Sequence, residues 1–469
     1  MEPPSSSKKN ALTIFGLAMI NVAAIGSIKN WPLLAEHGFN SLFFLILASF
    51  IFFIPLSLVS AELATGWPHL GGIYVWVKEA FGHRWGFLAA WLLWIENVFW
   101  YPTILSFITA SIAYIFDPSL AENKLFSLFT MIPLFWITTF INLRGMKISS
   151  AITSISVILG SFIPAFFIIM LSLSWLLGEK PIALEFSMNK LLPNFNNLND
   201  LVVFIGILFT LAGIEMSGVH AQDVNNPKKD YPKAIFLSVF LILMLYILGF
   251  FSIAIVIPQN DISLVSGALQ AFSHFVSAYN LKCLTPYLAV LLALGAIGSM
   301  STWTVGPVKS LLAAAKAGDL PAWTCDLNKY GMPYKLLMVQ ASFVSIISLL
   351  FLTMPSVSQA FWMISVIAAQ LYVLMYILLF LAALKLRSSQ PNTPRAYKVP
   401  GGSLGMKICV SLGLLSCILA LLVGFLKPSQ IPDNYYGSYL KIIISGILIT
   451  SSIPFLFNLG KLIHGKRKK

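Results

Sequence analysis

Long apolar runs alternate with short polar segments along almost the whole chain. A run of about 20 apolar residues is long enough for a helix that crosses the hydrocarbon core of a bilayer. The pattern predicts about twelve such helices, bounded by charged residues, glycine and proline. The predicted spans are residues 11–36, 39–64, 84–116, 125–143, 148–177, 200–221, 232–257, 284–315, 334–354, 357–385, 405–426 and 436–461.

Two of the connecting segments have patterns of their own. After the second run, residues 75–81 have the spacing of a short amphipathic helix at the cytoplasmic face. Between the seventh and eighth runs, residues 261–278 predict one or two short helices on the extracellular side. Both predictions place short helices against the ends of a bundle rather than across the membrane.

Composition and charge define the class of protein more closely. Of the 469 residues, 58% are hydrophobic and 10% are charged, and the mean hydropathy is +0.84, as in a polytopic membrane protein. The net charge of +13 comes from Lys and Arg that flank the apolar runs, so it indicates topology and not nucleic acid binding. These cations gather at the two termini and in the loops after even-numbered runs. Both termini are therefore predicted in the cytoplasm.

Two of the runs are interrupted in matching positions. The first run contains Gly26 and Ser27, and the sixth run contains Gly213. Each of these two runs is the first in a block of five. Paired interruptions of this kind indicate a transporter whose site lies between inverted repeats, where free N–H groups of the broken helices attract a carboxylate. The alternative is that these glycines only allow helices to pack closely. The predicted units are a tail (1–10), two five-helix repeats (11–177 and 199–385), two further helices (405–461) and a basic tail (462–469).

A carboxylate lies inside the second interruption. Glu215 follows Gly213 and Ile214 and precedes Ser217 within the sixth run. An ionisable group at membrane depth is expensive, so Glu215 is predicted to belong to a functional site. An apolar setting disfavours its charged form, which makes Glu215 a candidate for pH sensing or gating. The alternative is a carboxyl that is permanently hydrogen-bonded to backbone.

Two more charges are predicted at membrane depth. Lys29 lies just past the first interruption, and Glu96 lies near the middle of the third run. The hypothesis is that Lys29 and Glu96 face one another, or that Lys29 contacts the side-chain carboxylate of a substrate and takes part in pH sensing. The alternative is that Lys29 extends into an outer vestibule while its stem stays in apolar surroundings.

Short motifs along nearly the whole chain, from about residue 11 to 460, resemble the amino acid–polyamine–organocation superfamily, and within it the bacterial glutamate/GABA antiporters. This resemblance implies a ten-helix inverted-repeat core plus two helices, and exchange of an amino acid for its decarboxylation product, often for acid resistance. The motifs are Trp31-Pro32 with Gly38-Phe39, Ala61-Glu62-Leu63-Ala64-Thr65, Arg84-Trp85-Gly86-Phe87, Gly213-Ile214-Glu215-Met216-Ser217 with His220, Asn226-Pro227 with Asp230-Tyr231-Pro232, Trp303-Thr304-Val305-Gly306-Pro307, and Val399-Pro400-Gly401-Gly402.

The resemblance also implies which residues contact the substrate or line its pathway. Tyr372 and Tyr376 are four residues apart in the tenth run and so share one helix face, although an aromatic stripe of this kind also fits a packed core. Lys29 and Glu96 depart from the family pattern, which leaves the exact substrate open. The implied substrate-binding set is Gly26, Ser27, Gly213, Ile214, Ser217, Trp303, Tyr372 and Tyr376, to which Lys29, Glu96 and Glu215 are added from their own chemistry.

Two residues near the cytoplasmic ends of helices carry further expectations. His220, at the end of the sixth run, is a candidate pH sensor, with helix capping as the alternative. Glu62, at the inner end of the second run, is expected to pair with Lys309 or Lys316 in a structural role, with a role in coupling as the alternative.

Together with the interrupted runs, the resemblance to the glutamate/GABA antiporters implies an amino acid antiporter of the bacterial inner membrane that exchanges glutamate for GABA by alternating access and is activated by acid. A proton-coupled symporter or an exchanger of different specificity is the alternative on the same fold. An enzyme is disfavoured, because no nucleophile–base set and no His/Cys/Glu metal cluster is present in the sequence. Small amino acids and the lipid bilayer are the expected partners, and no metal or cofactor is expected.

Overall fold

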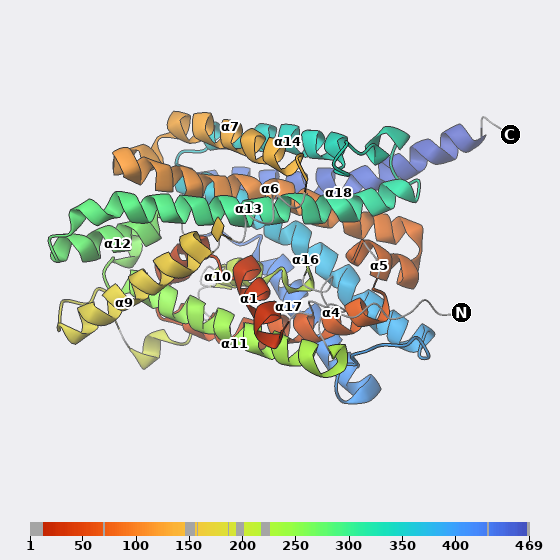
Figure 1. Cartoon of the computed structure of the whole chain (residues 1–469), viewed down its shortest axis with the longest axis horizontal. Coiled ribbons are helices and arrows are strands. Elements are labelled where there is room, and N and C mark those ends of the chain that lie inside the picture. Colours follow the sequence, from red (N-terminus) through yellow and green to blue (C-terminus); the bar gives the residue numbers. More distant parts are fainter. Residues whose placement is uncertain are drawn as a thin grey trace.

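The fold was obtained as a computed structural model, which describes residues 13–68, 71–145, 155–156, 158–185, 187–193, 201–216, 226–428 and 431–466. In this part of the chain the regular structure is helical, and long helices run side by side along the longest axis of the molecule (Figure 1). The all-α polytopic architecture predicted from the apolar runs is confirmed.

Within the described residues, ten stretches are long and apolar enough to cross a membrane, and a bent helix pair adds an eleventh. The bent pair consists of α1 (Ile14–Ile25) and, after the short turn η1 (Ile28–Asn30), α2 (Trp31–Glu36). The ten stretches contain α3 (Asn40–Ala48) with η2 (Ser49–Phe53) and α4 (Ile54–Gly66), α6 (His83–Phe116), α7 (Lys124–Asn142), η4 (Ile158–Phe162) with α9 (Ile163–Leu177), α11 (Pro227–Ala254), α13 (Thr285–Lys316), α14 (Tyr334–Ser348) with α15 (Leu350–Thr353), α16 (Val357–Ser389), α17 (Gly402–Val423) and α18 (Tyr436–Lys466).

The predicted sixth span is only partly described. It begins as α10 (Val203–Leu211), a short apolar helix that stops well before the predicted end at residue 221. Residues 217–225 lie outside the described part of the chain. The start of the predicted fifth span, residues 148–154, also lies outside the described part of the chain. The other observed and predicted spans agree to within a few residues, because charged residues and helix breakers bound the apolar runs.

Two short helices lie at opposite ends of the bundle (Figure 1). α5 (Ile73–Phe81) follows α4, as the amphipathic pattern after the second run predicts. α12 (Gly267–Ala278) lies in the segment between α11 and α13, where one or two short helices are expected. The two ends of the bundle are called the α5 end and the α12 end below.

The centre of the bundle is formed by α6, which packs against α13 and α16. Its side chains are buried along most of its length, and they include the polar residues Glu96, Asn97 and Thr103. α10 packs against α16, and α1 packs against α11. Residues from both interrupted helices line one cavity together with Glu96 and Asn97 of α6.

One close approach fixes the position of α2. The indole of Trp31 lies against Gly249 on α11, where an added Cβ would come within 2.1 Å of the ring. Any residue other than glycine at this position would therefore push the helices apart. Trp31 is fully buried in this notch.

Candidate substrate site

The first interruption separates α1 from α2. α1 ends at Ile25, Gly26 caps it, and Ser27 is extended with φ −88° and ψ 127°. The two halves are bent by 45°, and Pro32 lies in the first turn of α2, where its missing N–H is not needed. The interruption predicted from Gly26 and Ser27 is thus confirmed.

The second interruption follows α10. Ala212 is extended, and Gly213 has φ +114°, a conformation that other residues rarely adopt. A Cβ at Gly213 would also lie 3.0 Å from the ring of Trp303. Both backbone geometry and space therefore require glycine here.

Glu215 is held by the two tyrosines of α16. The hydroxyl of Tyr372 donates to its Oε1 at 2.5 Å, and the hydroxyl of Tyr376 donates to its Oε2 at 2.8 Å. The tyrosine rings stack with centroids 4.5 Å apart, so the predicted shared face is confirmed. Tyr376 also accepts a hydrogen bond from the N–H of Gly213 at 2.9 Å. The second interruption is thereby fastened to α16 through one carboxylate and one backbone amide.

A residue that the sequence analysis missed joins the two interruptions. Tyr246 of α11 lies with its hydroxyl oxygen 2.5 Å from the carbonyl oxygen of Ile25 and 3.2 Å from that of Thr210, and it donates to these carbonyls. It also accepts from the side-chain amide of Asn30 at 3.3 Å. Ends of helices leave carbonyl groups without partners in the helix, and this phenol satisfies them. Its only signal in the sequence is a tyrosine within an apolar run that also contains Ser238 and Ser252.

Lys29 and Glu96 line one small cavity between the interruptions, together with Ser27, Trp303 and Tyr372. The cavity measures about 40 Å³, which is room for a few water molecules and far less than the roughly 300–1,000 Å³ of common ligand sites. Side chains must therefore move before an amino acid can enter. The site is too small for an amino acid in this conformation.

The environments of the two charged groups differ. Lys29 Nζ donates to Thr103 Oγ1 at 3.0 Å and lies 5.5 Å from the ring centroid of Trp100, within cation–π range. Glu96 Oε1 accepts from the side-chain amide of Asn97 at 2.5 Å. Its Oε2 is buried and has no hydrogen-bond partner among the described residues.

The hypothesis that Lys29 and Glu96 face one another is met only in part. Both side chains line the same cavity, and their charges attract across it. Within the described part of the chain, however, the ion pairs within 4.0 Å do not include Lys29 with Glu96, because Thr103 holds the ammonium group. Lys29 is also buried, which excludes the alternative of a side chain extended into a vestibule.

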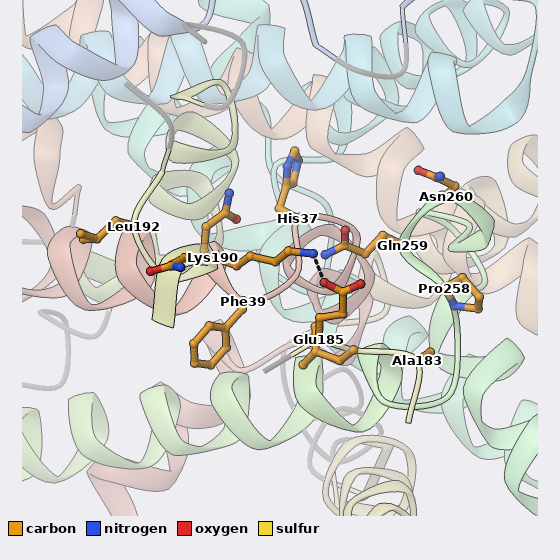
Figure 2. Close-up of a pocket in the computed structure, with 12 residues that line it drawn as sticks. His37, Phe39, Ala183, Glu185, Lys190, Leu192, Pro258, Gln259 and Asn260 are labelled. Atoms are coloured by element: carbon orange, nitrogen blue, oxygen red, sulfur yellow. Dashed lines mark hydrogen bonds and ion pairs between the residues drawn. The ribbon is translucent and has the colours of Figure 1, made fainter. Parts of the chain in front are cut away.

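A larger pocket of about 430 Å³ lies at the α12 end, away from this cavity. Lys190 and Glu185 form an ion pair in it and point toward each other in Figure 2, with His37 and Phe39 on opposite sides of the pair in this view. Burial lowers the pKa of His37 from 6.5 to about 4. Gln259 also lines the pocket.

The expectation for Glu62 is wrong. Its carboxylate accepts hydrogen bonds from Arg387 of α16 and from the backbone N–H of Val399, and Arg395 lies 3.5 Å away. The expected partners on α13 are thus replaced by arginines from the end of α16 and from the loop beyond it. Two other predicted residues, Ser217 and His220, lie outside the described residues.

A polytopic helical protein in which two interrupted helices meet at a buried cavity with charged walls has the architecture of a secondary transporter. Its sequence matches the amino acid permease family over residues 10–450, and the chain belongs to this family. The predicted superfamily is therefore confirmed, and the family is one of transporters and not of enzymes.

Three relatives illustrate the range of the family. An uncharacterised transporter of Legionella pneumophila is 44% identical over 96% of this chain and 97% of its own length. A glutamate/gamma-aminobutyrate antiporter of Lactococcus lactis is 29% identical over 95% of this chain and 90% of its own. A probable agmatine/putrescine antiporter of Lactococcus lactis is 27% identical over 94% and 93%. All three are similar along most of their length.

Proposed function

We propose that this protein is an amino acid antiporter of the bacterial inner membrane that takes up glutamate and releases GABA. The observation that carries the proposal is the small cavity between the two helix interruptions, with the amino group of Lys29 and the carboxyl group of Glu96 in its wall. Both substrates carry an ammonium and a carboxylate group, which a cavity with one charge of each sign suits. The similarity to a glutamate/gamma-aminobutyrate antiporter along most of both chains supports the same pair.

Alternating access is the proposed mechanism. In the described conformation, Tyr246 joins the carbonyl ends of both interruptions, and Glu215 joins the second interruption to α16. Opening toward one side of the membrane would break one set of these contacts and keep the other. The residues proposed to contact the substrate or gate its passage are Gly26, Ser27, Lys29, Glu96, Gly213, Ile214, Glu215, Ser217, His220, Trp303, Tyr372 and Tyr376.

Orientation and regulation are part of the same proposal. The gathering of Lys and Arg at the termini and in alternate loops supports a topology with both termini in the cytoplasm. Exchange is proposed to be faster at acidic external pH, with Glu215 as the group that binds the proton. The two tyrosine hydroxyls on Glu215 support this role, because any change at this carboxylate reaches the second interruption through Tyr376.

Uptake of labelled glutamate into proteoliposomes at acidic pH tests the function directly. Uptake that requires GABA inside the vesicles is the expected result. Uptake that needs a proton gradient but no internal GABA would favour the proton-coupled symporter, for which a buried carboxylate such as Glu215 would also serve. Absence of uptake by folded protein under both conditions would exclude glutamate as the substrate.

A further inference from the structure

The wall of the cavity between the interruptions contains one carboxyl oxygen that has no hydrogen-bond partner among the described residues. Glu96 is 2% exposed, and its Oε2 has no hydrogen-bond partner within the described part of the chain, whereas its Oε1 is bound by Asn97. A buried carboxylate oxygen without a donor is costly, so this position calls for a ligand that donates hydrogen bonds. An ammonium group offers three N–H donors and a compensating charge.

The other charges near the cavity do not fill this role. Both carboxylate oxygens of Glu215 are occupied by Tyr372 and Tyr376. The ammonium of Lys29 is directed to Thr103 and to the rings of Trp100 and Phe361, at 5.5 and 5.3 Å from their centroids. These cation–π contacts and the hydroxyl are the partners of the Lys29 ammonium group among the described residues. The ion pairs within 4.0 Å in this part of the chain do not include Lys29. Among the described residues, the cavity therefore presents one free acidic acceptor and one cation that is held apart from it.

The chemistry of the proposed substrates matches this arrangement. Decarboxylation of glutamate removes the α-carboxylate and leaves the amino group and the side-chain carboxylate, which become the two charged ends of GABA. Glutamate and GABA thus share an ammonium group and a carboxylate joined by the same three-carbon chain. A site that exchanges them needs one acceptor for the shared ammonium group and one cation for the shared carboxylate.

We propose that Glu96 of α6 binds the ammonium group that the two exchanged substrates share, and that Lys29 of η1, in the wall of the same cavity, binds their distal carboxylate. The site thereby selects short ω-amino acids, in which the two charges stand at the ends of a chain. The α-carboxylate of glutamate is the one charged group that this pair does not bind. This inference rests on the proposed function and names the residues that determine its specificity.

A ligand that lacks one of the two charged groups of GABA tests the contact to the remaining group alone. 4-Hydroxybutyrate is GABA with a hydroxyl in place of the amino group, and 4-amino-1-butanol is GABA with an alcohol in place of the carboxylate. Glu96→Gln removes the negative charge of the acceptor and keeps its size. It should weaken the binding of GABA at least about 10-fold, as loss of a hydrogen bond between charged groups does, and change the binding of 4-hydroxybutyrate by less than about 2-fold.

The experiment measures affinities for full-length protein in detergent from the rise of its thermal midpoint with ligand concentration. Lys29→Gln should show the reverse pattern, with GABA weakened and 4-amino-1-butanol unchanged. Glu122→Gln is the matched control, since Glu122 contacts Ser263 outside the cavity. It should bind all three ligands as the wild type does. A melting transition and a monodisperse elution profile establish that each variant is folded.

Equal weakening of GABA and 4-hydroxybutyrate by Glu96→Gln, or no weakening of either, would overturn the assignment. So would a folded wild-type protein that binds neither GABA nor glutamate. The proposed function fails separately. If the wild type binds GABA through Glu96 but does not exchange glutamate for GABA in proteoliposomes, the specificity assignment stands and the transport reaction is a different one.

Discussion

Glu62 on α4 accepts two hydrogen bonds from the guanidinium of Arg387 on α16, at 2.6 Å to Oε1 and 2.5 Å to Oε2. The carboxylate is 2% exposed, and Arg395 and the backbone of Val399 complete its surroundings. This cluster ties the end of α4 to the end of α16 and to the loop that follows. It lies at the end of α16, the helix that carries Tyr372 and Tyr376.

Replacing the buried acid of this cluster should destabilise the folded protein. Glu62→Gln leaves the charge of Arg387 without its main partner, and breaking a buried ion pair on one side costs about 3–5 kcal/mol. The thermal midpoint in detergent should fall clearly. Glu185→Gln, in the exposed pair with Lys190, is the control and should leave the midpoint almost unchanged. Equal midpoints for the two variants would show that the Glu62 cluster is not structural.

Removal of one hydroxyl tests whether the two interruptions are coupled. Tyr246→Phe leaves the buried carbonyl of Ile25 without its donor, which costs about 1–3 kcal/mol. The exchange rate should fall together with the thermal midpoint. Tyr439→Phe removes a comparable bond to the carbonyl of Gly424 on another helix, so it should lower the midpoint without slowing exchange. An exchange rate in Tyr246→Phe equal to that of Tyr439→Phe would contradict the coupling.

The conformation of Gly213 makes a third prediction. Gly213→Ala places a side chain at φ +114° and 3.0 Å from Trp303, with a cost of order 1–3 kcal/mol for the backbone alone. Glutamate uptake into proteoliposomes should fall strongly, because the second interruption can no longer keep its shape. Gly437→Ala, in the exposed first turn of α18 with open space around it, is the matched substitution and should keep full activity. Comparable uptake by both variants would argue against a required shape at Gly213.

His37 makes the stability of the protein depend on pH. Its pKa is about 4 when folded and 6.5 when exposed, because burial disfavours the charged imidazole. The unfolded state then binds more protons between these values, so this contribution to stability is complete above about pH 6.5 and is lost as the pH falls toward 4. Thermal midpoints measured across this range should fall less steeply for His37→Gln than for the wild type. Parallel curves would show that His37 titrates normally.

The apolar pattern was sufficient to predict the helices and the two interruptions. Glycine in an apolar run can also serve close helix packing, as Gly249 does, so it was the matching positions of Gly26 and Gly213 in the first and sixth runs that were informative. The four-residue spacing of Tyr372 and Tyr376 correctly predicted a common face, because helix geometry fixes it. A partner on another helix is a different matter, since spacing within one helix carries no information about it.

This is why the partners of charged groups were harder to predict. Glu62 pairs with Arg387, more than 300 residues further along the chain, and not with a lysine of α13. Lys29 and Glu96 were expected to meet, but the hydroxyl of Thr103 holds the lysine. Tyr246 was missed because nothing near it in the sequence reveals that two broken helices end beside it.

The notch at Gly249 has a consequence for how the first interruption can move. Tyr246 and Gly249 are one turn apart on α11 and so lie on the same face of that helix. Through this face, the phenol of Tyr246 contacts the end of α1 and Gly249 contacts Trp31 of α2. α11 therefore restrains the angle between α1 and α2 by contacting both of them. A movement that changes this angle either moves α11 together with α1 and α2 or separates the indole of Trp31 from Gly249.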